Sequence, residues 1–409
     1  MSLKCQKTAS IVGLGQIGLP LAVLSAMSGL GVFGVDASKN RLQAINNFDE
    51  HSIEADVLFL LKGDVVRENL KLSHGLSQKS DYIIFAVPTP FYPDTNIINL
   101  NILTGAITDS LNFFKKGVVV ILESTVPVGY SIFISRKINF LTGLECGKDF
   151  FLAYSPERLL PGNAIKELVS NERIVGGVTD ICSQKAAYFY EQILTAPISK
   201  TTSMIAEATK VFENSFRLLN IAFANEIYNF SKSLEIDPFE LITLANKHPR
   251  VNIHAPGIGV GGDCLPVHPY LLPYLPSSIQ LALEINKNQE DVILGEILNA
   301  VNNLQQDCAK ILALGITYKP DVRDLRNSPA LNICKKLNQT PCVDLFVRDP
   351  FFSIEEVSSL GLKGDSGQDF LEFDLVVILV GHTLFFENKN KLMSQAKKIL
   401  DPVLILGIT

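Results

Sequence analysis

Short apolar runs alternate with segments of helical periodicity from the start of the chain. The runs at 9–15, 31–36, 80–90, 117–129 and 151–162 each predict a buried strand that enters a loop, and residues 16–30 predict a helix. Strands that alternate with helices are typical of a doubly wound parallel sheet, whose ligands bind at the edge where the strands end. We therefore expect an N-terminal Rossmann domain over residues 1–200.

The pattern changes at residue 203. Residues 203–236 continue at helical period without Pro or Gly, which predicts one long helix of the kind that often forms a subunit interface. Strand and helix patterns resume at 308–321, 328–337, 341–350, 373–381 and 398–408. The predicted fold is α/β, with two Rossmann-like doubly wound parallel sheets joined by a central helical domain. The centre is expected at 201–298 and the C-terminal sheet at 299–409.

Composition and charge exclude several classes of protein. Of the 409 residues, 47% are hydrophobic and 19% charged, which is ordinary for a soluble globular protein. A net charge of −6 gives no basic footprint for nucleic acid, and no apolar run reaches the roughly 18 residues that span a membrane. Seven scattered cysteines do not form a disulfide framework, so we expect a cytoplasmic protein.

A glycine-rich turn follows the first predicted strand. Gly13, Gly15 and Gly18 form a G-x-G-x-x-G pattern that opens a helix, where backbone can approach a pyrophosphate closely. Asp36 ends the second strand and can bind a ribose 2′-hydroxyl, which favours NAD over NADP. Lys39 and Arg41 leave some room for NADP.

The stretch "GVGGDCLPVHPY" places Cys264 among glycines. Its chemistry alone leaves three interpretations open. The thiol can be an inert core cysteine, or a nucleophile that the glycines leave accessible. The third interpretation is a zinc site, whose ligands would be Asp263, Cys264 and His268 with His248 or His254. The sequence contains no CxxC or HExxH motif that would support it.

The long helix carries polar residues at helical spacing. Glu207, Lys210, Asn214 and Arg217 share one face, while the phenylalanines lie largely elsewhere. Asn is a poor helix former, yet Asn214, Asn220 and Asn225 all lie in mid-helix. This cost indicates a polar site, although a solvated stripe is the ordinary alternative.

Several motifs in one order give a family resemblance over nearly the whole chain. The sequence resembles the UDP-glucose/GDP-mannose dehydrogenase family, the nucleotide-sugar 6-dehydrogenases, and within it the UDP-N-acetylmannosamine and related UDP-N-acetylhexosamine branch. The matching stretches are "IVGLGQIGLPLA", "VPTP", "ESTVPVG", "SPERLLPG" with "RIVGG", "AEATKVFENSFRLLNIAFANE", "HPRVNIHAPGIGVGGDC" and "LGITYKPDVRDLRNSPAL".

The resemblance implies oxidation of the C6 alcohol of a UDP-sugar to a carboxylate, with two NAD⁺ per turnover. An aldehyde cannot release a second hydride until a nucleophile adds to it, and the resemblance gives Cys264 this role. A place in surface polysaccharide synthesis is expected with this activity. The long apolar helix predicts a homodimer or larger homo-oligomer, packed through the central domain.

The resemblance further assigns residues to the site. The implied catalytic residues are Cys264, Lys210, Asn214, Thr125, Glu157 and His268. The implied cofactor-binding residues are Gly13, Gly15, Gln16, Ile17, Gly18, Asp36, Arg41, Pro88, Thr89, Thr125 and Arg326. The implied substrate-binding residues are Glu157, Arg158, Lys210, Asn214, Arg250, Gly261 and Lys319. No metal is implied.

One departure from the family pattern concerns the acid near the cysteine. Relatives read "GGHC" followed by "VDP", whereas this chain reads "GGDC" followed by "VHP". His268 therefore stands where the family has an aspartate, and whether Asp263 compensates is left open. We expect a UDP-N-acetylhexosamine 6-dehydrogenase. The alternatives are a UDP-glucose 6-dehydrogenase and a nucleotide-sugar-binding protein without turnover.

Overall fold

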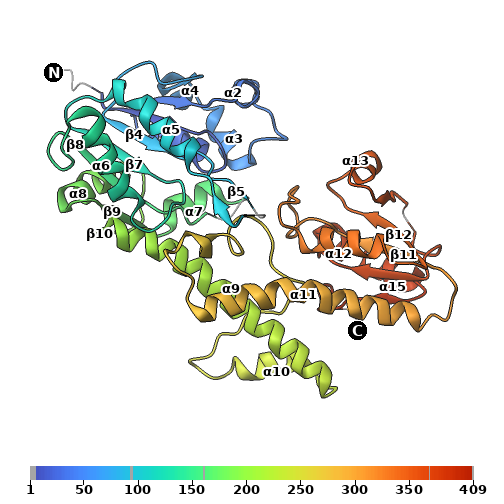
Figure 1. The fold of residues 1–409 in the computed structure, drawn as a ribbon. Helices are drawn as coiled ribbons and strands as arrows, with labels where there is room; N and C mark the ends of the chain where they lie inside the picture. The colour runs from blue at the N-terminus through green and yellow to red at the C-terminus, as the bar shows by residue number, and fades with distance from the viewer. Residues whose placement is uncertain (1–5, 93–94, 160–161, 368, 408–409) are drawn as a thin grey trace. The chain divides into compact units, whose positions relative to one another are not determined.

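The computed structural model describes residues 6–92, 95–159, 162–367 and 369–407. The chain divides into two compact units (Figure 1). The first comprises Met1–Phe212 with Tyr270–Pro273, and the second Glu213–Pro269 with Tyr274–Thr409. Each unit has its own sheet, mostly parallel in the first unit and parallel throughout in the second.

The sheet of the first unit contains a strand in each of the five predicted runs, and it contains further strands at 70–73, 173–177 and 198–202 that were not predicted. Its strand order is β10-β9-β8-β7-β4-β1-β2-β3, and the strands are parallel except where β8 pairs with β9. The strands are β1 (Thr8–Val12), β2 (Gly31–Val35), β3 (Leu70–Ser73), β4 (Tyr82–Phe85), β7 (Val118–Leu122), β8 (Phe150–Tyr154), β9 (Arg173–Gly177) and β10 (Ile198–Thr202). A separate hairpin pairs β5 (Phe91–Tyr92) with β6 (Ile97–Ile98).

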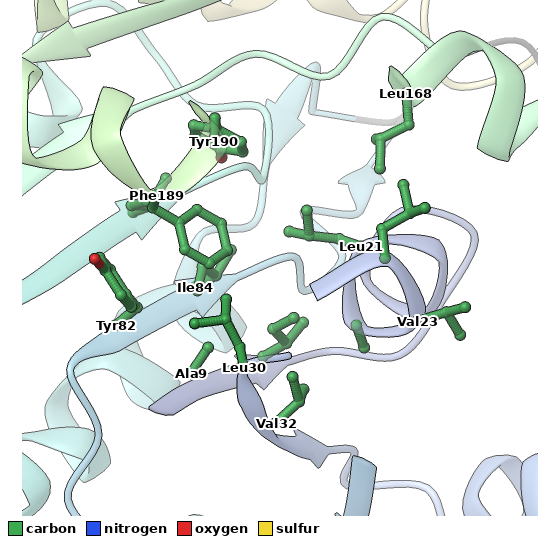
Figure 2. Close-up of a cluster of buried hydrophobic side chains, with 14 of the residues drawn as sticks. Ala9, Leu21, Val23, Leu30, Val32, Tyr82, Ile84, Leu168, Phe189 and Tyr190 are labelled. Atoms are coloured by element: carbon green, nitrogen blue, oxygen red, sulfur yellow. The ribbon is translucent and has the colours of Figure 1, made fainter. Parts of the chain in front are cut away.

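Helices cover this sheet. They are α1 (Gly18–Met27), α2 (Lys39–Asn46), α3 (Ala55–Leu61), α4 (Asp64–Asn69), α5 (Asn101–Ser110), the 3₁₀ turn η1 (Leu111–Phe113), α6 (Tyr130–Thr142), α7 (Ala164–Ser170) and α8 (Asp180–Glu191). Figure 2 shows part of the core, in which Leu21 and Val23 of α1 lie in one cluster with Ile84 of β4 and Phe189 of α8. The strands at the centre of the sheet read as continuous apolar runs because both their faces are buried.

The predicted long helix is α9 (Ser203–Ser233). Its burial runs against the usual pattern, since Glu207, Lys210 and Asn214 are buried while Phe216 and Phe223 are more than half exposed. Near its middle, Leu218 and Ala222 pack with Ala282 of α11 (Ser277–Asn302), a helix that the apolar pattern did not predict. The second unit also contains α10 (Pro238–Ala245). The short 3₁₀ turn η2 (His268–Leu271) follows the cysteine loop.

The second sheet has the order β13-β12-β11-β14-β15, and all its pairs are parallel. Its strands are β11 (Ala309–Leu314), β12 (Val343–Arg348), β13 (Lys363–Gly364), β14 (Leu375–Ile378) and β15 (Ile399–Leu400), and its helices are α12 (Pro329–Asn338), α13 (Ile354–Ser359), α14 (Thr383–Glu387) and α15 (Lys389–Gln395). The predicted fold class, with two doubly wound sheets and a helical connection, is confirmed.

The strand predicted over 398–408 is much shorter than expected. Within this segment only Ile399 and Leu400 (β15) pair with β14, because the carboxylate of Asp401 accepts the N–H groups of Ile405 at 2.6 Å and Leu406 at 2.8 Å and turns the chain. Residue 408 lies outside the described residues. No helix within the described part of the chain combines the length and the apolarity that crossing a membrane requires.

Candidate active site

The glycine turn after β1 has the backbone geometry that the motif predicts. Gly13 has a φ of +93°, and a side chain there would collide with the carbonyl of Ala86. A Cβ on Gly18 would meet the carbonyl of Gly13, so this glycine lets α1 approach the turn. A Cβ on Gly15 would meet nothing within 4 Å. Gln16 and Ile17 complete the turn, and Ile17 is the N-cap residue of α1. The exposed backbone at the start of α1 fits a pyrophosphate.

A cavity of about 750 Å³ adjoins this turn. It is lined by Gly13, Asp36, Pro88 and residues of α5 among others, and its size suits the adenosine half of a dinucleotide. Asp36 is held in place because its carboxylate accepts the N–H of Leu14 at 2.9 Å and that of Ser38 at 2.8 Å. The cavity and the acid at the end of β2 fit NAD.

Arg41 has a different setting from the other predicted cofactor residues. Its guanidinium donates to the carbonyl of Leu14 at 2.7 Å and to that of Ser52 at 2.8 Å. Burial lowers the pKa of Arg41, although Asp36 and Asp49 act in the opposite direction. Arg41 therefore stabilises the glycine turn, because its guanidinium donates hydrogen bonds to backbone carbonyls of the protein.

Two further predicted residues meet at the ends of β4 and β7. The hydroxyl of Thr89 donates to the carbonyl of Thr125 at 3.1 Å. The hydroxyl of Ser124 donates to the carbonyl of Val87 at 2.7 Å, so the "VPTP" and "ESTVPVG" segments are joined twice. Both loops follow neighbouring parallel strands, which is why the chain brings them to one edge.

Lys210 and Glu157 are also brought together. The ammonium of Lys210 contacts the backbone carbonyl of Glu157 and lies 3.5 Å from its carboxylate. The two side chains are only 9% and 16% exposed, so little water screens them. The carboxylate of Glu157 also accepts the N–H of Leu159 at 2.6 Å. The lysine is thus fixed on the "SPER" segment directly after β8.

A buried ionic network contacts the "SPER" segment from the interior of the first unit. The composition of the chain did not predict this network. The guanidinium of Arg173 donates to the hydroxyl of Ser155 at 2.9 Å and forms an ion pair with Glu123. The hydroxyl of Tyr190 donates to Glu123 at 2.5 Å. Burial raises the pKa of Glu123, while Arg173 opposes that rise. Arg173 appears in the sequence only within the family stretch "RIVGG".

Glu207 has a structural place on the polar face of α9. Its carboxylate accepts the N–H groups of Gly129 at 2.6 Å and Ser131 at 2.8 Å, at the start of α6. A carboxylate at a helix N-terminus satisfies donors that otherwise have no partner in the helix. Burial nevertheless raises the pKa of Glu207.

Asn214 and His268 are in contact in the second unit. The amide nitrogen of Asn214 lies 2.5 Å from Nδ1 of His268, and both side chains are buried. The backbone N–H of His268 donates to the carbonyl of Cys264 at 2.8 Å, which closes a turn after the cysteine. Cys264 itself is exposed. Exposure argues against the inert core cysteine.

The other mid-helix asparagines hold the backbone that leads to this turn. Asn220 donates to the carbonyl of Asn252 at 2.7 Å and accepts the N–H of His254 at 2.7 Å. Asn225 accepts the N–H of Gly257 at 2.8 Å. The cost of Asn in a helix is therefore explained by loop anchoring. Arg217, predicted on the same polar face, is exposed.

The glycines before Cys264 serve close packing within the second unit. A Cβ on Gly261 would lie 2.3 Å from the carbonyl of Asn327, and one on Gly262 would lie 2.8 Å from the ring of Tyr318. The backbone N–H of Gly262 donates to the carbonyl of Arg326 at 2.9 Å. Close packing is thus a further reason for these glycines, because they seat the cysteine loop on the "YKPD" and "DLRNSP" segments.

Asp263 does not take the place of the missing acid. Its carboxylate forms an ion pair with Arg326, which also donates to both oxygens of Asp324 at 3.0 Å. The hydrogen bond with Asp324 and the charges of both acids raise the pKa of Arg326. Because His268 contacts Asn214 and Asp263 contacts Arg326, the exchanged residues have separate partners.

Lys319 lies on the loop after β11, and hydrogen bonds hold that loop. The hydroxyl of Thr317 donates to the carbonyl of Lys319 at 2.9 Å. Nδ1 of buried His382 accepts the N–H of Asp321 at 3.0 Å, so its Nε2 carries the proton and faces Asp349 at 3.2 Å. The ammonium of Lys319 lies 5.8 Å from the ring centre of Tyr318. His382 and Asp349 were not predicted; only their positions after β14 and β12 could have pointed to them.

Two predicted arginines have simpler settings. Arg158 donates to the carbonyl of Glu172 at 3.1 Å. Arg250 is exposed, and its backbone N–H lies 3.3 Å from Nδ1 of His248. Within the described ranges, no group of three or more His, Cys, Asp or Glu side chains could hold a metal ion, so the zinc alternative has no assembled ligand set.

Comparison with protein families matches three consecutive segments of the chain to one family. Residues 7–194 match the NAD binding domain of the UDP-glucose/GDP-mannose dehydrogenase family, 204–292 its central domain, and 312–407 its UDP binding domain. The chain belongs to this family. It is therefore an NAD-dependent nucleotide-sugar dehydrogenase, and the predicted enzyme class and cofactor are confirmed.

Individual members of the family are similar over almost the whole chain. A UDP-N-acetyl-D-mannosamine dehydrogenase of Campylobacter jejuni is 38% identical over 397 residues, covering 92% of this chain and 96% of the relative. An NDP-N-acetyl-D-galactosaminuronic acid dehydrogenase of Ralstonia solanacearum is 34% identical and covers 93% and 92%. The solved structure of a UDP-D-ManNAc dehydrogenase from Pyrococcus horikoshii superposes with a TM-score of 0.87 at 34% identity, covering 97% and 96%.

Proposed function

We propose that this protein oxidises the C6 hydroxyl of a UDP-N-acetylhexosamine to the carboxylate, with UDP-N-acetylmannosamine as the first candidate. The observation that carries the proposal is the exposed thiol of Cys264 on an anchored turn, in a chain that belongs to a family of nucleotide-sugar dehydrogenases. The choice of an N-acetylated sugar is supported by the names of relatives such as the Campylobacter jejuni enzyme.

Cys264 makes the second oxidation possible. When bound, NAD accepts a hydride from the substrate carbon in each of the two oxidations. Between them, the Cys264 thiolate adds to the aldehyde and forms a thiohemiacetal, whose second oxidation gives a thioester. Water then cleaves the thioester and releases the acid and the thiol. The covalent bond also retains the aldehyde between the steps.

Lys210 and Glu157 supply charge near the reacting oxygen. The buried ammonium of Lys210 stabilises the negative charge that develops when the hydroxyl loses its proton, and it does so strongly because little water surrounds it. Glu157 acts as the acid or base that moves this proton, and Thr125 orients the water for thioester cleavage. Asn214 donates a hydrogen bond and is itself held by His268.

Cationic side chains bind the charged parts of the ligands. Lys319 and Arg250 bind the UDP-sugar, with contributions from Arg158 and the backbone at Gly261, and Arg326 binds a phosphate of the cofactor. Because Arg326 already pairs with Asp263 and Asp324, the phosphate has to compete with carboxylates for it.

A panel of UDP-sugars tests the proposal. With purified protein and excess NAD, we expect UDP-N-acetylmannosamine or another UDP-N-acetylhexosamine to give two NADH per sugar consumed, measured by absorbance, and one uronate, measured by mass spectrometry. Production of two NADH from UDP-glucose alone would contradict the choice of substrate. One NADH per sugar would contradict the covalent route, because the reaction would then stop at the aldehyde.

We further propose that the enzyme is a cytoplasmic homo-oligomer, at least a dimer, that supplies surface polysaccharide synthesis. The exposed phenylalanines of α9 support the oligomer. The functional division proposed is an NAD-binding part at 1–200, a central part at 201–298 and a UDP-sugar-binding part at 299–409, in keeping with the order of the matched family domains.

A further inference from the structure

Two cysteines from separate elements meet within the first unit. Cys146 lies on the turn between α6 and β8, and Cys182 lies in the first turn of α8. Their sulfur atoms are 3.7 Å apart, which is van der Waals contact. Cys182 is buried and Cys146 is partly exposed, so the pair has one face toward solvent.

The local backbone holds the two sulfurs at this distance. The N–H of Gly147 donates to the carbonyl of Phe150 at 2.7 Å and closes a tight turn beside Cys146. Gly147 has a φ of +87°, and a Cβ there would come within 3.0 Å of the hydroxyl of Thr179. That hydroxyl lies 3.1 Å from the sulfur of Cys182. The glycine thus lets the turn pack directly against the start of α8.

The groups around the two thiols favour Cys182 as the nucleophile and Cys146 as the thiol that keeps its proton. The contact with the Cys146 thiol lowers the pKa of Cys182, and the hydrogen bond from the hydroxyl of Thr179 acts in the same direction. The same contact, together with burial, raises the pKa of Cys146. The N-terminus of α8 adds a favourable dipole for a thiolate at Cys182. The contact with Cys146, the hydroxyl of Thr179 and the start of α8 therefore favour a thiolate at Cys182 over one at Cys146.

We propose that Cys146 and Cys182 form a reversible oxidation site that peroxide converts to a disulfide. The Cys182 thiolate attacks one oxygen of hydrogen peroxide and becomes a sulfenic acid, releasing hydroxide. Cys146 then attacks the sulfenic sulfur, a sulfur–sulfur bond forms, and the thiol proton and the departing hydroxide leave as water. The pair loses two electrons, and the peroxide gains them. This chemistry is independent of Cys264 and of the proposed substrate.

Peptide mapping of the full chain tests the site. The Cys264→Ser variant is exposed to increasing hydrogen peroxide, remaining thiols are alkylated, and the digest is analysed by mass spectrometry. We expect a peptide pair joined through Cys146 and Cys182, lighter by about 2 Da than the two thiol peptides together. Dithiothreitol should restore both thiols, and the oxidised protein should unfold at a higher temperature because the link constrains its unfolded state.

Matched variants separate this site from general oxidation. Cys334→Ser serves as the control, because Cys334 is fully buried and its pKa is raised to about 12. This change should leave the link intact. Cys146→Ser should leave Cys182 as a sulfenic acid that dimedone traps. Conversion of Cys182 to sulfinic acid while Cys146 still alkylates would overturn the proposal. So would oxidation of both thiols no faster than Cys334. The unsubstituted chain gives the same map if a variant does not fold.

Discussion

At the scale of single residues, the polar contacts of the candidate site join side chains that lie far apart in the sequence. Lys210 and Glu157 were selected from separate motifs and lie together in the structure. Asn220 and Asn225 were predicted to have a polar role, because Asn is unfavourable in a helix. Their actual partners are backbone groups of a loop, which the spacing of residues along the helix could not predict. The place of Asp263 depended on Arg326, which lies 63 residues away in sequence. Such pairings follow from the tertiary fold, so residue types alone could not predict them.

The role proposed for Cys264 gives a prediction at this scale. Cys264→Ser should bind NAD normally but form no uronate, because a serine hydroxyl is a far weaker nucleophile than a thiolate. We expect uronate formation to fall at least 100-fold, measured by mass spectrometry, with NAD affinity from titration unchanged. Cys308→Ser, at another exposed cysteine, is the control and should be fully active. A serine variant that still yields two NADH per sugar would exclude covalent catalysis.

At the scale of elements, regular apolar patterns were sufficient for the central strands and for α9. They were insufficient for α11, because the polar run at 286–291 interrupts its apolar period. The structure explains that run in part, since Asn286 bonds both backbone groups of Val260 and Gln289 donates to the carbonyl of Gly257. The antiparallel pairing of β9 with β8 was equally hidden, because pairing direction depends on long-range topology. The apolar periodicity of a helix such as α11 is interrupted where its polar residues bind a loop, so this periodicity alone does not predict the helix.

The loops after β11, β12 and β14 give a prediction for acid stability. Asp349 is buried, and burial alone would raise its pKa, but hydrogen bonds from His382 and the N–H groups of Ile316 and Phe351 lower it below the ordinary value of 3.8. A lowered pKa in the folded state means that the stabilisation is complete above about pH 4 and is lost as the pH falls further. Asp349→Asn should therefore destabilise the second unit by about 1–3 kcal/mol at pH 7, and the difference from the unsubstituted protein should shrink below pH 4.

Amide hydrogen exchange of Ile316 and Phe351 is the direct measurement for this prediction, since both groups donate to Asp349. The variant should exchange them faster at pH 7. Asp344→Asn is the control, because Asp344 pairs with Lys363 at the surface and should have little effect. A constant difference between Asp349→Asn and the unsubstituted protein from pH 7 to pH 3 would contradict the assigned role of the charge.

At the scale of the whole molecule, α9 distributes its residues in the reverse of the usual surface helix. Ile205, Phe212, Phe216, Phe223 and Phe230 are each about half exposed. At 3.6 residues per turn they fall within about 40° of one another around the helix, and they extend over about 37 Å of its length. We call these five residues the apolar stripe of α9. The opposite face carries Glu207, Lys210 and Asn214, which are buried, so the stripe is the apolar face that α9 leaves exposed. A long apolar stripe of this kind is typical of an interface between subunits.

Replacement of one residue in the apolar stripe of α9 tests the oligomer without touching the proposed catalytic residues. A dimer with twofold symmetry would bury the stripe of each subunit against its partner, and each phenylalanine would contribute about 1.5–3 kcal/mol. Phe223→Asp places a charge at its centre and should convert the protein to monomers. By size-exclusion chromatography with light scattering, we expect twice the 44.9 kDa of one chain for the unsubstituted protein and a single chain mass for the variant. Phe140→Asp is the control, because Phe140 is 87% exposed on α6 and outside the stripe. An unsubstituted protein that elutes as one chain at micromolar concentration would exclude the dimer, and dissociation by Phe140→Asp alone would move the interface to another surface.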